Sequence, residues 1–256
     1  MTNPVALVTG SSRGIGFQAC RKLAMAGFSI AVNAPNSDEE FENAVCSIES
    51  LGASVYRAAF DVSDTRVHTS MLEKIELKLG PLTTLVNNAG IGVIERGDPL
   101  DVTEESFDRC MQVNARAVFF LSQAFARRLV SRERHDTHFQ SIINVTSANA
   151  QSVAETRAEY SASKAAASMI SSAFAVRLGR ENISVYDVQP GLINTEMTRS
   201  VIDSYTERAK EGLCLIPRVG QPEEVGEVIA NLATGVLPYT TGQVVSVDGG
   251  MLVPRF

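Results

Sequence analysis

Short runs of β-branched and apolar residues alternate along the chain with longer stretches that have the spacing of amphipathic helices. The runs predict strands at residues 5–9, 29–33, 54–59, 84–87, 141–146, 184–189 and 243–247. The longer stretches predict helices at about residues 15–26, 38–51, 64–79, 104–130, 159–178 and 222–234. This alternation predicts βαβ units, and therefore an α/β fold with a doubly wound parallel sheet of about seven strands and helices on both faces.

Candidate helix starts refine this outline. Ser37, Ser63 and Thr103 stand just before three of the expected helices, where a hydroxyl can cap free backbone N–H groups, and Pro222 suits a first helical position. No internal repeat, low-complexity tract or linker divides the 256 residues. Because α/β folds of this length still form one unit, we expect a single domain over residues 1–256.

Composition and charge exclude several classes of protein. The chain is 45% hydrophobic and 20% charged, which is typical of a soluble globular protein. It has no apolar run near the ~18 residues that suggest a membrane span, and its start lacks the regions of a signal peptide. We therefore expect a cytoplasmic protein with no membrane partner. The net charge of −6 argues against a nucleic-acid partner.

The cysteines and histidines do not have the spacing of a metal site. The four cysteines are widely separated, at Cys20, Cys46, Cys110 and Cys214. They form no Cys-x-x-Cys, and three lie in helix-like apolar stretches, so we expect reduced core thiols. His135 and His138 form a close pair in a polar, charged segment, which is more typical of a solvated loop than of a zinc site.

A glycine-rich loop follows the first expected strand. The sequence Thr9-Gly10-Ser-Ser-Arg13-Gly14-Ile15-Gly16 leads directly into a helix pattern. Glycine permits a tight turn and a close backbone approach, and the helix N-terminus offers free N–H groups to a pyrophosphate. Since the loop lies between a strand and a helix in the first βαβ unit, it predicts a dinucleotide site.

Tyr160 and Lys164 stand four residues apart in an expected helix, so their side chains share one face. A neighbouring ammonium favours the ionised form of a phenol, as proton transfer near neutral pH requires. The spacing alone is weak evidence, because a buried ring and a solvated amine often stand four apart by chance. Other motifs must decide its meaning.

Six motifs in one order make the chain resemble the short-chain dehydrogenase/reductase family over essentially its whole length. They are the loop 9–16, Asn87-Asn88-Ala89-Gly90, Asn114, Ser147, Tyr160-x-x-x-Lys164 and Pro190-Gly191. Each is only moderately specific, but each stands at the strand or helix boundary that the family requires. The resemblance implies a Rossmann fold, and it is nearest to members of the 3-oxoacyl-[acyl-carrier-protein] reductase kind.

The resemblance implies a catalytic site of four residues that needs no metal. Tyr160 would be the general acid in carbonyl reduction and the base in alcohol oxidation, while Lys164 would favour the phenolate and bind the nicotinamide ribose. Ser147 would hold the substrate oxygen, although a serine that caps a turn is a common alternative. Asn114 would hold a water beside Lys164, and asparagine is a poor interior helix residue, which favours a specific role.

The resemblance also implies the cofactor contacts, and these favour NADP(H) while NAD(H) stays open. NAD is usually bound by an acidic residue about 20 positions past the glycines, but residues 32–37 contain no carboxylate. Arg13 could pair with a 2′-phosphate, with Asn33 nearby, or it could be a solvated loop cation. The expected cofactor-binding residues are Gly10, Ser12, Arg13, Gly14, Ile15, Gly16, Asn33, Asp61, Val62, Asn88, Ala89, Gly90, Tyr160, Lys164, Pro190, Gly191, Ile193 and Thr195.

Three segments depart from the regular alternation. Residues 131–140 lengthen the connection before Ser147, and the arginines in and near it could form a basic patch or a solvated charged face. These are Arg127, Arg128, Arg132 and Arg134. Residues within 191–219 are expected to form an apolar, mobile substrate lid. The tail 251–256 could reach a neighbouring subunit or could be a frayed end.

The leading hypothesis is an NADP(H)-dependent reductase of ketones, similar to 3-oxoacyl reductases, that acts on a small-molecule carbonyl or alcohol. A dehydrogenase of sugars, polyols or other small hydroxy compounds is the close alternative. A non-catalytic cofactor-binding sensor would lack a catalytic residue, and none is missing. Epimerases and dehydratases of the longer relatives need more chain. Small residues around Tyr160 allow close helix packing, and the resemblance implies a homotetramer or homodimer.

Overall fold

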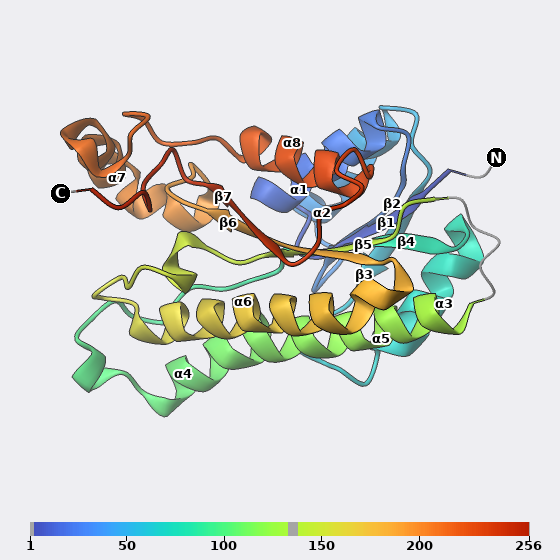
Figure 1. Ribbon diagram of the computed structural model, residues 1–256, viewed down its shortest axis with the longest axis horizontal. Helices are drawn as coiled ribbons and strands as arrows, with labels where there is room; N and C mark the ends of the chain where they lie inside the picture. The colour runs from blue at the N-terminus through green and yellow to red at the C-terminus, as the bar shows by residue number, and fades with distance from the viewer. Residues whose placement is uncertain (1–2, 133–137, 256) are drawn as a thin grey trace.

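The computed structural model describes residues 3–132 and 138–255, which form a parallel sheet between two layers of helices (Figure 1). The sheet order is β3-β2-β1-β4-β5-β6-β7. Its strands are β1 (Val5–Val8), β2 (Ser29–Ala34), β3 (Val55–Ala59), β4 (Leu82–Asn87), β5 (Ser141–Val145), β6 (Ser184–Pro190) and β7 (Gln243–Val247). The order reverses between β1 and β4, which opens a ligand crevice at the carboxyl ends of these strands. The predicted doubly wound sheet is confirmed.

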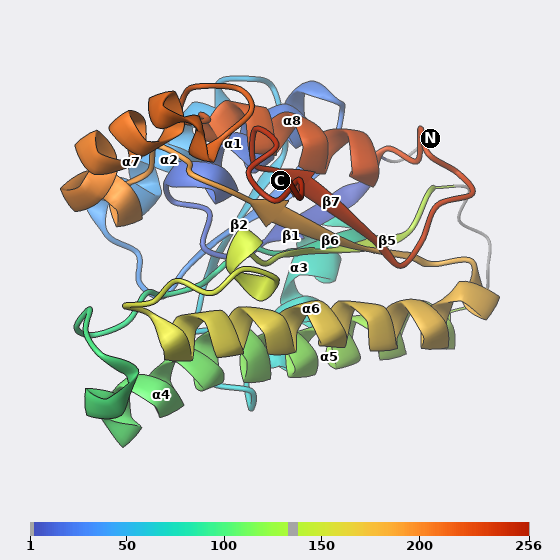
Figure 2. The ribbon, with the colours of Figure 1, turned by 60° about the vertical axis from the view of Figure 1, so that its left-hand side comes forward.

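Helices cover both faces of the sheet (Figures 1 and 2). One layer contains α1 (Gly14–Met25), α2 (Glu39–Glu49) and α8 (Pro222–Ala233), and the other contains α3 (His68–Leu79), α5 (Val118–Ser131) and α6 (Ala158–Leu178). Successive side chains of a strand point to opposite faces. Accordingly, Ala6 and Val8 of β1 join one core, whereas Val5 and Leu7 join the other. Burial on both faces explains why these strands read as continuous apolar runs.

The predicted helix 104–130 is interrupted. It consists of α4 (Glu104–Met111), a π-helical segment (Gln112–Ala117) and α5. As predicted, Thr103 caps α4 by accepting a hydrogen bond from Ser106 N at 3.2 Å. Single π-helical turns occur most often at functional sites, because the extra residue turns a side chain inward. Here the inward residue is Asn114, which is buried.

Two predicted caps were wrong. The cap of α2 is Asp38, whose carboxylate accepts from Phe41 N at 2.9 Å, instead of Ser37. The helix expected from residue 64 begins only at His68. Asp64 is held in a turn, because its carboxylate accepts from the backbone N–H and the guanidinium of Arg66. The prediction for the last helix is confirmed, since α8 begins at Pro222.

The segment 191–219 and the C-terminal tail pack against each other. This segment, which was expected to form a substrate lid, contains η5 (Glu196–Val201), α7 (Ile202–Arg208) and the π-helical η6 (Ala209–Leu213). Arg255 Nη2 donates to the carbonyl of Gly212 at 2.8 Å, and Ile216 N donates to the carbonyl of Gly249 at 2.9 Å. The described tail residues are therefore bound to the segment 191–219 of their own chain and are not frayed.

Three of the four cysteines behave as expected. Cys20, Cys110 and Cys214 are buried and Cys46 is exposed, and all four are free thiols. Burial raises the pKa of the Cys20 thiol to about 12, so it is an inert core group. The expectation of a core position was wrong for Cys46, which lies on the outer side of α2.

The described residues contain no helix that could cross a membrane. Nor do residues 3–132 and 138–255 contain three or more histidine, cysteine, aspartate or glutamate side chains grouped for a metal ion. His135 and Arg134, from the expected solvated segment, lie outside the described residues.

The expected basic patch is wrong for two of its arginines. Arg128 Nε donates to Glu76 Oε2 at 2.8 Å, and Arg132 contacts the other oxygen of the same carboxylate. Arg132 Nη1 also donates to the carbonyl of Leu82 at 2.8 Å. These arginines fasten α5 to α3 and β4, so their charge is compensated within the fold.

Candidate active site

The glycine loop after β1 lies against the loop after β4. A Cβ on Gly10 would stand 2.8 Å from Ala89 Cα, and a Cβ on Gly16 would stand 2.4 Å from both Asn88 Nδ2 and Gly10 O. Asn88 Nδ2 donates to the carbonyls of Thr9 and Gly10, both at 2.9 Å. Only glycine allows this approach. Two segments that are separate in sequence thus form one wall of the crevice.

The N-terminus of α1 is suited to an anion. Its N-cap residue Arg13 makes no side-chain cap hydrogen bond, and the first turn contains no acidic residue. Gly14 has φ +57°, and the only neighbour near its missing Cβ is Thr195, at 3.9 Å. Free N–H groups and the positive end of the helix dipole therefore face a shallow cradle. These features fit the pyrophosphate of a dinucleotide.

The side chain of Asn33 holds the glycine loop in place. Its Oδ1 accepts from Gly10 N at 3.1 Å, and its Nδ2 donates to the carbonyls of Ala58 and Phe60 at 2.8 and 3.0 Å. The side chain is buried. Its two amide N–H groups are therefore used within the protein, and one lone pair of Oδ1 stays open, so the expected contact of Asn33 with the cofactor stays a prediction.

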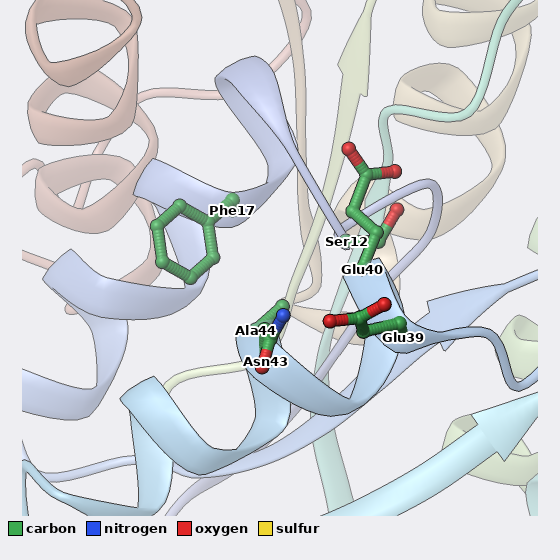
Figure 3. A pocket seen from close by; sticks show the side chains of 6 residues that line it. All are labelled: Ser12, Phe17, Glu39, Glu40, Asn43 and Ala44. Carbon is green, nitrogen blue, oxygen red and sulfur yellow. The ribbon is translucent and has the colours of Figure 1, made fainter.

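Residues 32–37 contain no carboxylate, but the first turn of α2, which follows them, contains several. Glu39 and Glu40 line a pocket of about 440 Å³ together with Ser12, Phe17, Asn43 and Ala44, and Figure 3 shows the Phe17 ring on the opposite side from the two carboxyl groups. Arg13 Nη1 lies 3.2 Å from Glu40 Oε2. Sequence reasoning overlooked this pair, because acidic residues in a first turn are usually explained by the helix dipole.

Tyr160 and Lys164 lie on the inner face of α6, at the carboxyl end of the sheet. Tyr160 is 8% exposed and Lys164 is 5% exposed. Lys164 Nζ donates to the carbonyl of Val145 at 3.1 Å and stands 5.8 Å from the centroid of the Tyr160 ring. No carboxylate among the described residues pairs with this ammonium. The ammonium therefore lies buried beside the Tyr160 ring.

Asn114 joins the loop after β4 to α6. Its Oδ1 accepts from Ile91 N at 2.8 Å, and its Nδ2 donates to Ile91 O and to Ser163 Oγ, both at 3.0 Å. A Cβ on Gly90 would stand 3.2 Å from Asn114 Oδ1 and 3.3 Å from Lys164 Nζ. The structure thus brings Asn114 and Lys164 together at Gly90, while the water that Asn114 was expected to hold beside Lys164 stays a prediction.

Ser147 lies just after β5, at the carboxyl end of the sheet, and is buried. Its Oγ accepts from Asn149 N at 3.1 Å, so it caps the short helix Ala148–Ala150. This bond uses an oxygen lone pair and leaves the hydroxyl proton free to donate. The capping role and a substrate-binding role are therefore compatible.

The remaining predicted residues surround the crevice from β3 and β6. Asp61 follows β3, and its Oδ1 accepts from Ser63 N at 2.8 Å, next to the buried Val62. Gly191 follows Pro190 of β6, and a Cβ there would stand 2.7 Å from Asp248 Cα. Ile193 is buried, and Thr195 caps η5.

Sequence reasoning missed Arg157, which immediately precedes α6. Its guanidinium carbon lies 5.2 Å from the centroid of the Tyr160 ring, and its Nη2 donates to Asn149 Oδ1 at 3.1 Å. Its place three residues before the tyrosine was a signal, since residues three apart on a helix are neighbours.

Comparison with known proteins gives a consistent result. Residues 4–206 match the family model described as short chain dehydrogenase. The chain is 33% identical over 252 residues to a gluconate 5-dehydrogenase of Gluconobacter oxydans (strain 621H), covering 97% of this chain and 94% of that protein. It is 34% identical over 251 residues to a 5-keto-D-gluconate 5-reductase of Escherichia coli (strain K12), covering 96% of this chain and 94% of that protein.

A similar solved structure is a 3-oxoacyl-[acyl-carrier protein] reductase from Brucella melitensis in complex with NAD. The TM-score is 0.96 and the sequence identity is 33%, with all of both chains covered.

Proposed function

Because the chain belongs to the short-chain dehydrogenase family, we propose that Tyr160, Ser147 and Lys164 handle the proton and the substrate oxygen in an NADP(H)-dependent reduction of a ketone. The family places the chain among oxidoreductases that act on CH–OH groups. The observation that carries the residue roles is the buried Tyr160–Lys164 pair, which meets Asn114 at Gly90.

The chemistry follows from the charge that develops on the substrate oxygen. When bound, the nicotinamide supplies hydride to a carbonyl carbon or accepts it from an alcohol carbon. Tyr160 then gives its proton to the carbonyl oxygen, while the Ser147 hydroxyl donates a hydrogen bond to the same oxygen. Two donors in a site with little water stabilise the developing negative charge. Oxidation of an alcohol runs through the same groups in reverse.

Lys164 acts through position and charge. Its hydrogen bond to Val145 O holds the ammonium beside Tyr160 and leaves further N–H donors free for a ribose hydroxyl. A nearby cation stabilises the phenolate that remains after Tyr160 has released its proton. The Asn114 side chain already forms hydrogen bonds with Ile91 and Ser163. We therefore propose that the backbone carbonyl of Asn114, within the π-helical segment, contacts the water.

NADP(H) is the favoured cofactor, and NAD(H) is the second candidate. The stretch 32–37 contains no carboxylate for a 2′-hydroxyl, and Arg13 stands on the glycine loop. Arg13 is 61% exposed and Glu40 is 47% exposed, and exposed ion pairs contribute only about 0–1 kcal/mol. A 2′-phosphate can therefore displace Glu40 at little cost. The NAD bound to the Brucella melitensis protein supports the second candidate.

Two substrate classes are supported. The structural neighbour is named as a 3-oxoacyl-[acyl-carrier protein] reductase, whereas two relatives are named for gluconate and 5-keto-D-gluconate. Both classes present a ketone or a secondary alcohol to the same hydroxyl groups. The lid exposes Met197, Leu215 and Ile216, which are each about half exposed and can cover an apolar part of a substrate. The lid within residues 191–219 and the single domain over 1–256 stay predictions.

We also propose that the chain forms a homodimer through α5 and α6, and a homotetramer if a second face joins. The two helices run side by side on the outside of one layer (Figure 2). They border a pocket of about 520 Å³ that is lined by Phe119 and Phe174, whose ring centroids are 5.4 Å apart. Exposed apolar side chains near the β7 edge offer the second face: Val236, Leu237, Tyr239 and Val244.

A panel of carbonyl compounds tests the proposed function. Purified protein is mixed with NADPH or NADH and with 3-oxoacyl thioesters, 5-keto-D-gluconate or simple ketones, and the absorbance of the reduced nicotinamide is followed. We expect turnover with NADPH for at least one class. Cofactor binding without turnover of any carbonyl or alcohol would identify a sensor instead. A cytoplasmic location stays a prediction from the sequence.

A further inference from the structure

Arg157 touches both segments that carry the reactive hydroxyl groups. Its guanidinium packs over the ring of Tyr160 at 5.2 Å from the centroid. Its Nη2 donates to Asn149 Oδ1 at 3.1 Å, and Asn149 also contacts Ser147 through its backbone N–H. The cation therefore borders the space in which a substrate carbonyl would lie between Tyr160 and Ser147.

The charge of Arg157 is not compensated by the fold. Within residues 3–132 and 138–255 it forms no ion pair, in contrast to Arg218, which pairs with Glu224. The neighbouring buried carboxylate of Glu159 accepts from Ser106 Oγ at 2.7 Å instead. Arg157 also precedes the N-terminus of α6, where the helix dipole adds positive potential. Arg157 thus adds a positive charge beside Tyr160 that no described carboxylate pairs with.

Part of the guanidinium is also without hydrogen bonds. Nε is buried and has no partner, and Nη1 makes no hydrogen bond to a described residue. Nη1 and the second N–H of Nη2 form the end of the guanidinium, where two parallel N–H donors match the two oxygens of a carboxylate. Buried donors without partners, such as Nε, are rare, because each carries a desolvation cost.

We propose that Arg157 binds the carboxylate of an oxo-acid or hydroxy-acid substrate. This inference rests on the proposed function and narrows its substrate class. Because the guanidinium packs directly on Tyr160, the carboxylate stands only a few carbon–carbon bonds from the reacting carbonyl. Short oxo acids and sugar acids meet this condition. A 3-oxoacyl thioester does not, because the atoms next to its ketone carry no charge.

The test compares each of two acids with its neutral ester. The holoenzyme with NADPH reduces 4-oxopentanoate or methyl 4-oxopentanoate, and 5-keto-D-gluconate or its methyl ester, and kcat/KM is measured for each. The readout is the acid-to-ester ratio in wild type, Arg157→Met, Arg157→Lys and the control Arg180→Met. Arg180 is exposed in the turn Gly179–Glu181 at the far end of α6, so its substitution removes the same charge away from the site.

We expect wild type and Arg180→Met to prefer the acid, and Arg157→Met to lower the ratio roughly ten- to hundredfold, mainly through KM, as is typical for loss of a hydrogen bond to a charged group. Arg157→Lys should recover part of the preference, since it keeps the charge and loses the planar fork. Reduced nicotinamide titrations report whether each variant still binds cofactor. If Arg157→Met does not fold, the acid-to-ester ratio of Arg157→Lys is compared with that of wild type, and a lower ratio is expected.

Two results would overturn the inference separately from the proposed function. Wild type that reduces ketones but prefers the esters, or an unchanged ratio in the Arg157 variants, leaves the reductase intact and removes Arg157 as the carboxylate site. Absence of turnover with all carbonyl substrates overturns both.

Discussion

The ammonium of Lys164 donates a hydrogen bond of 3.1 Å to the carbonyl oxygen of Val145, the last residue of β5. This bond fixes a buried cation from α6 to the carboxyl edge of the sheet. The aromatic ring of Tyr160 stands one helical turn away, so a strand end and a helix together fix the position of the ammonium beside the ring.

Tyr160→Phe removes the proton donor and keeps the ring. We expect turnover to fall by about 10²–10⁴-fold or more, as is typical for loss of a general acid. Binding of NADPH, measured by fluorescence titration, should change little, because the phenyl ring keeps its contacts with Arg157 and Lys164. Full activity in this variant would contradict the mechanism.

Gly90→Ala tests the meeting point of Asn114 and Lys164. The added Cβ would stand 3.2 Å from Asn114 Oδ1 and 3.3 Å from Lys164 Nζ, so both must shift by a few tenths of an ångström. We expect kcat to fall about tenfold, because a small misplacement of catalytic groups lowers rates strongly. Gly92→Ala is the matched control, since no atom lies within 4 Å of its Cβ position. Equal kcat losses in the two variants would refute the arrangement.

Because Arg13 and Glu40 form an ion pair, substitutions of the two residues should have opposite effects on NADPH binding. Arg13→Ala should weaken NADPH binding about tenfold and leave NADH binding nearly unchanged, because only NADPH carries the 2′-phosphate. Glu40→Gln should strengthen NADPH binding a few-fold, since it frees Arg13 and removes a like charge. Dissociation constants for both cofactors check this. A wild type that prefers NADH would be inconsistent with the choice of NADP(H).

Phe119→Glu tests the proposed subunit interface. Phe119 packs against Phe120 and Phe174 on the outer face of α5 and α6. A carboxylate there would lose its hydration in a dimer and would no longer pack against the neighbouring rings, which disfavours association. We expect analytical ultracentrifugation to show a smaller species than wild type. Leu77→Glu is the control, because Leu77 is 91% exposed on α3. An unchanged molar mass of the Phe119→Glu species would show that this face is not the subunit interface.

The buried His68 should make the folded protein less stable in mild acid. Its ring is buried, Nε2 lies 2.8 Å from Val62 O, and Nδ1 has no partner. Burial holds the pKa of His68 below its usual value of 6.5. Below that value the unfolded chain takes up a proton that the folded protein refuses, so the free energy of unfolding decreases as pH falls through this window. Urea unfolding at several pH values should show a weaker pH dependence in His68→Gln. Identical pH dependence would exclude this role.

Several site features could be predicted from sequence because they are local. The spacing of Tyr160 and Lys164, the glycines of the loop 9–16 and the cap at Thr103 depend on residues a few positions apart. The strands followed from apolar runs, since every strand of a doubly wound sheet is covered on both faces. The order of these motifs along the chain then identified the family.

Other features required the three-dimensional arrangement. Asn33 was expected beside the cofactor, and its amide also joins the glycine loop to the carbonyls of Ala58 and Phe60. Arg128 was considered for a basic patch or a solvated charged face, but it pairs with Glu76, 52 residues earlier. Arg157 had no motif around it. A side chain's partner depends on which distant elements pack beside it, and spacing along the chain does not report this.

By itself, the sequence determined the class of fold, because helix and strand periodicity can be read from neighbouring residues, and the order of its motifs indicated the family. The catalytic roles of Tyr160, Lys164, Ser147 and Asn114 are implied by that family and stay predictions. Only the tertiary structure decided which charges are compensated: Arg13 by Glu40, Arg128 and Arg132 by Glu76, and Arg157 by no described carboxylate. Electrostatic pairing depends on distances of a few ångströms between elements far apart in sequence, and those distances are set by packing.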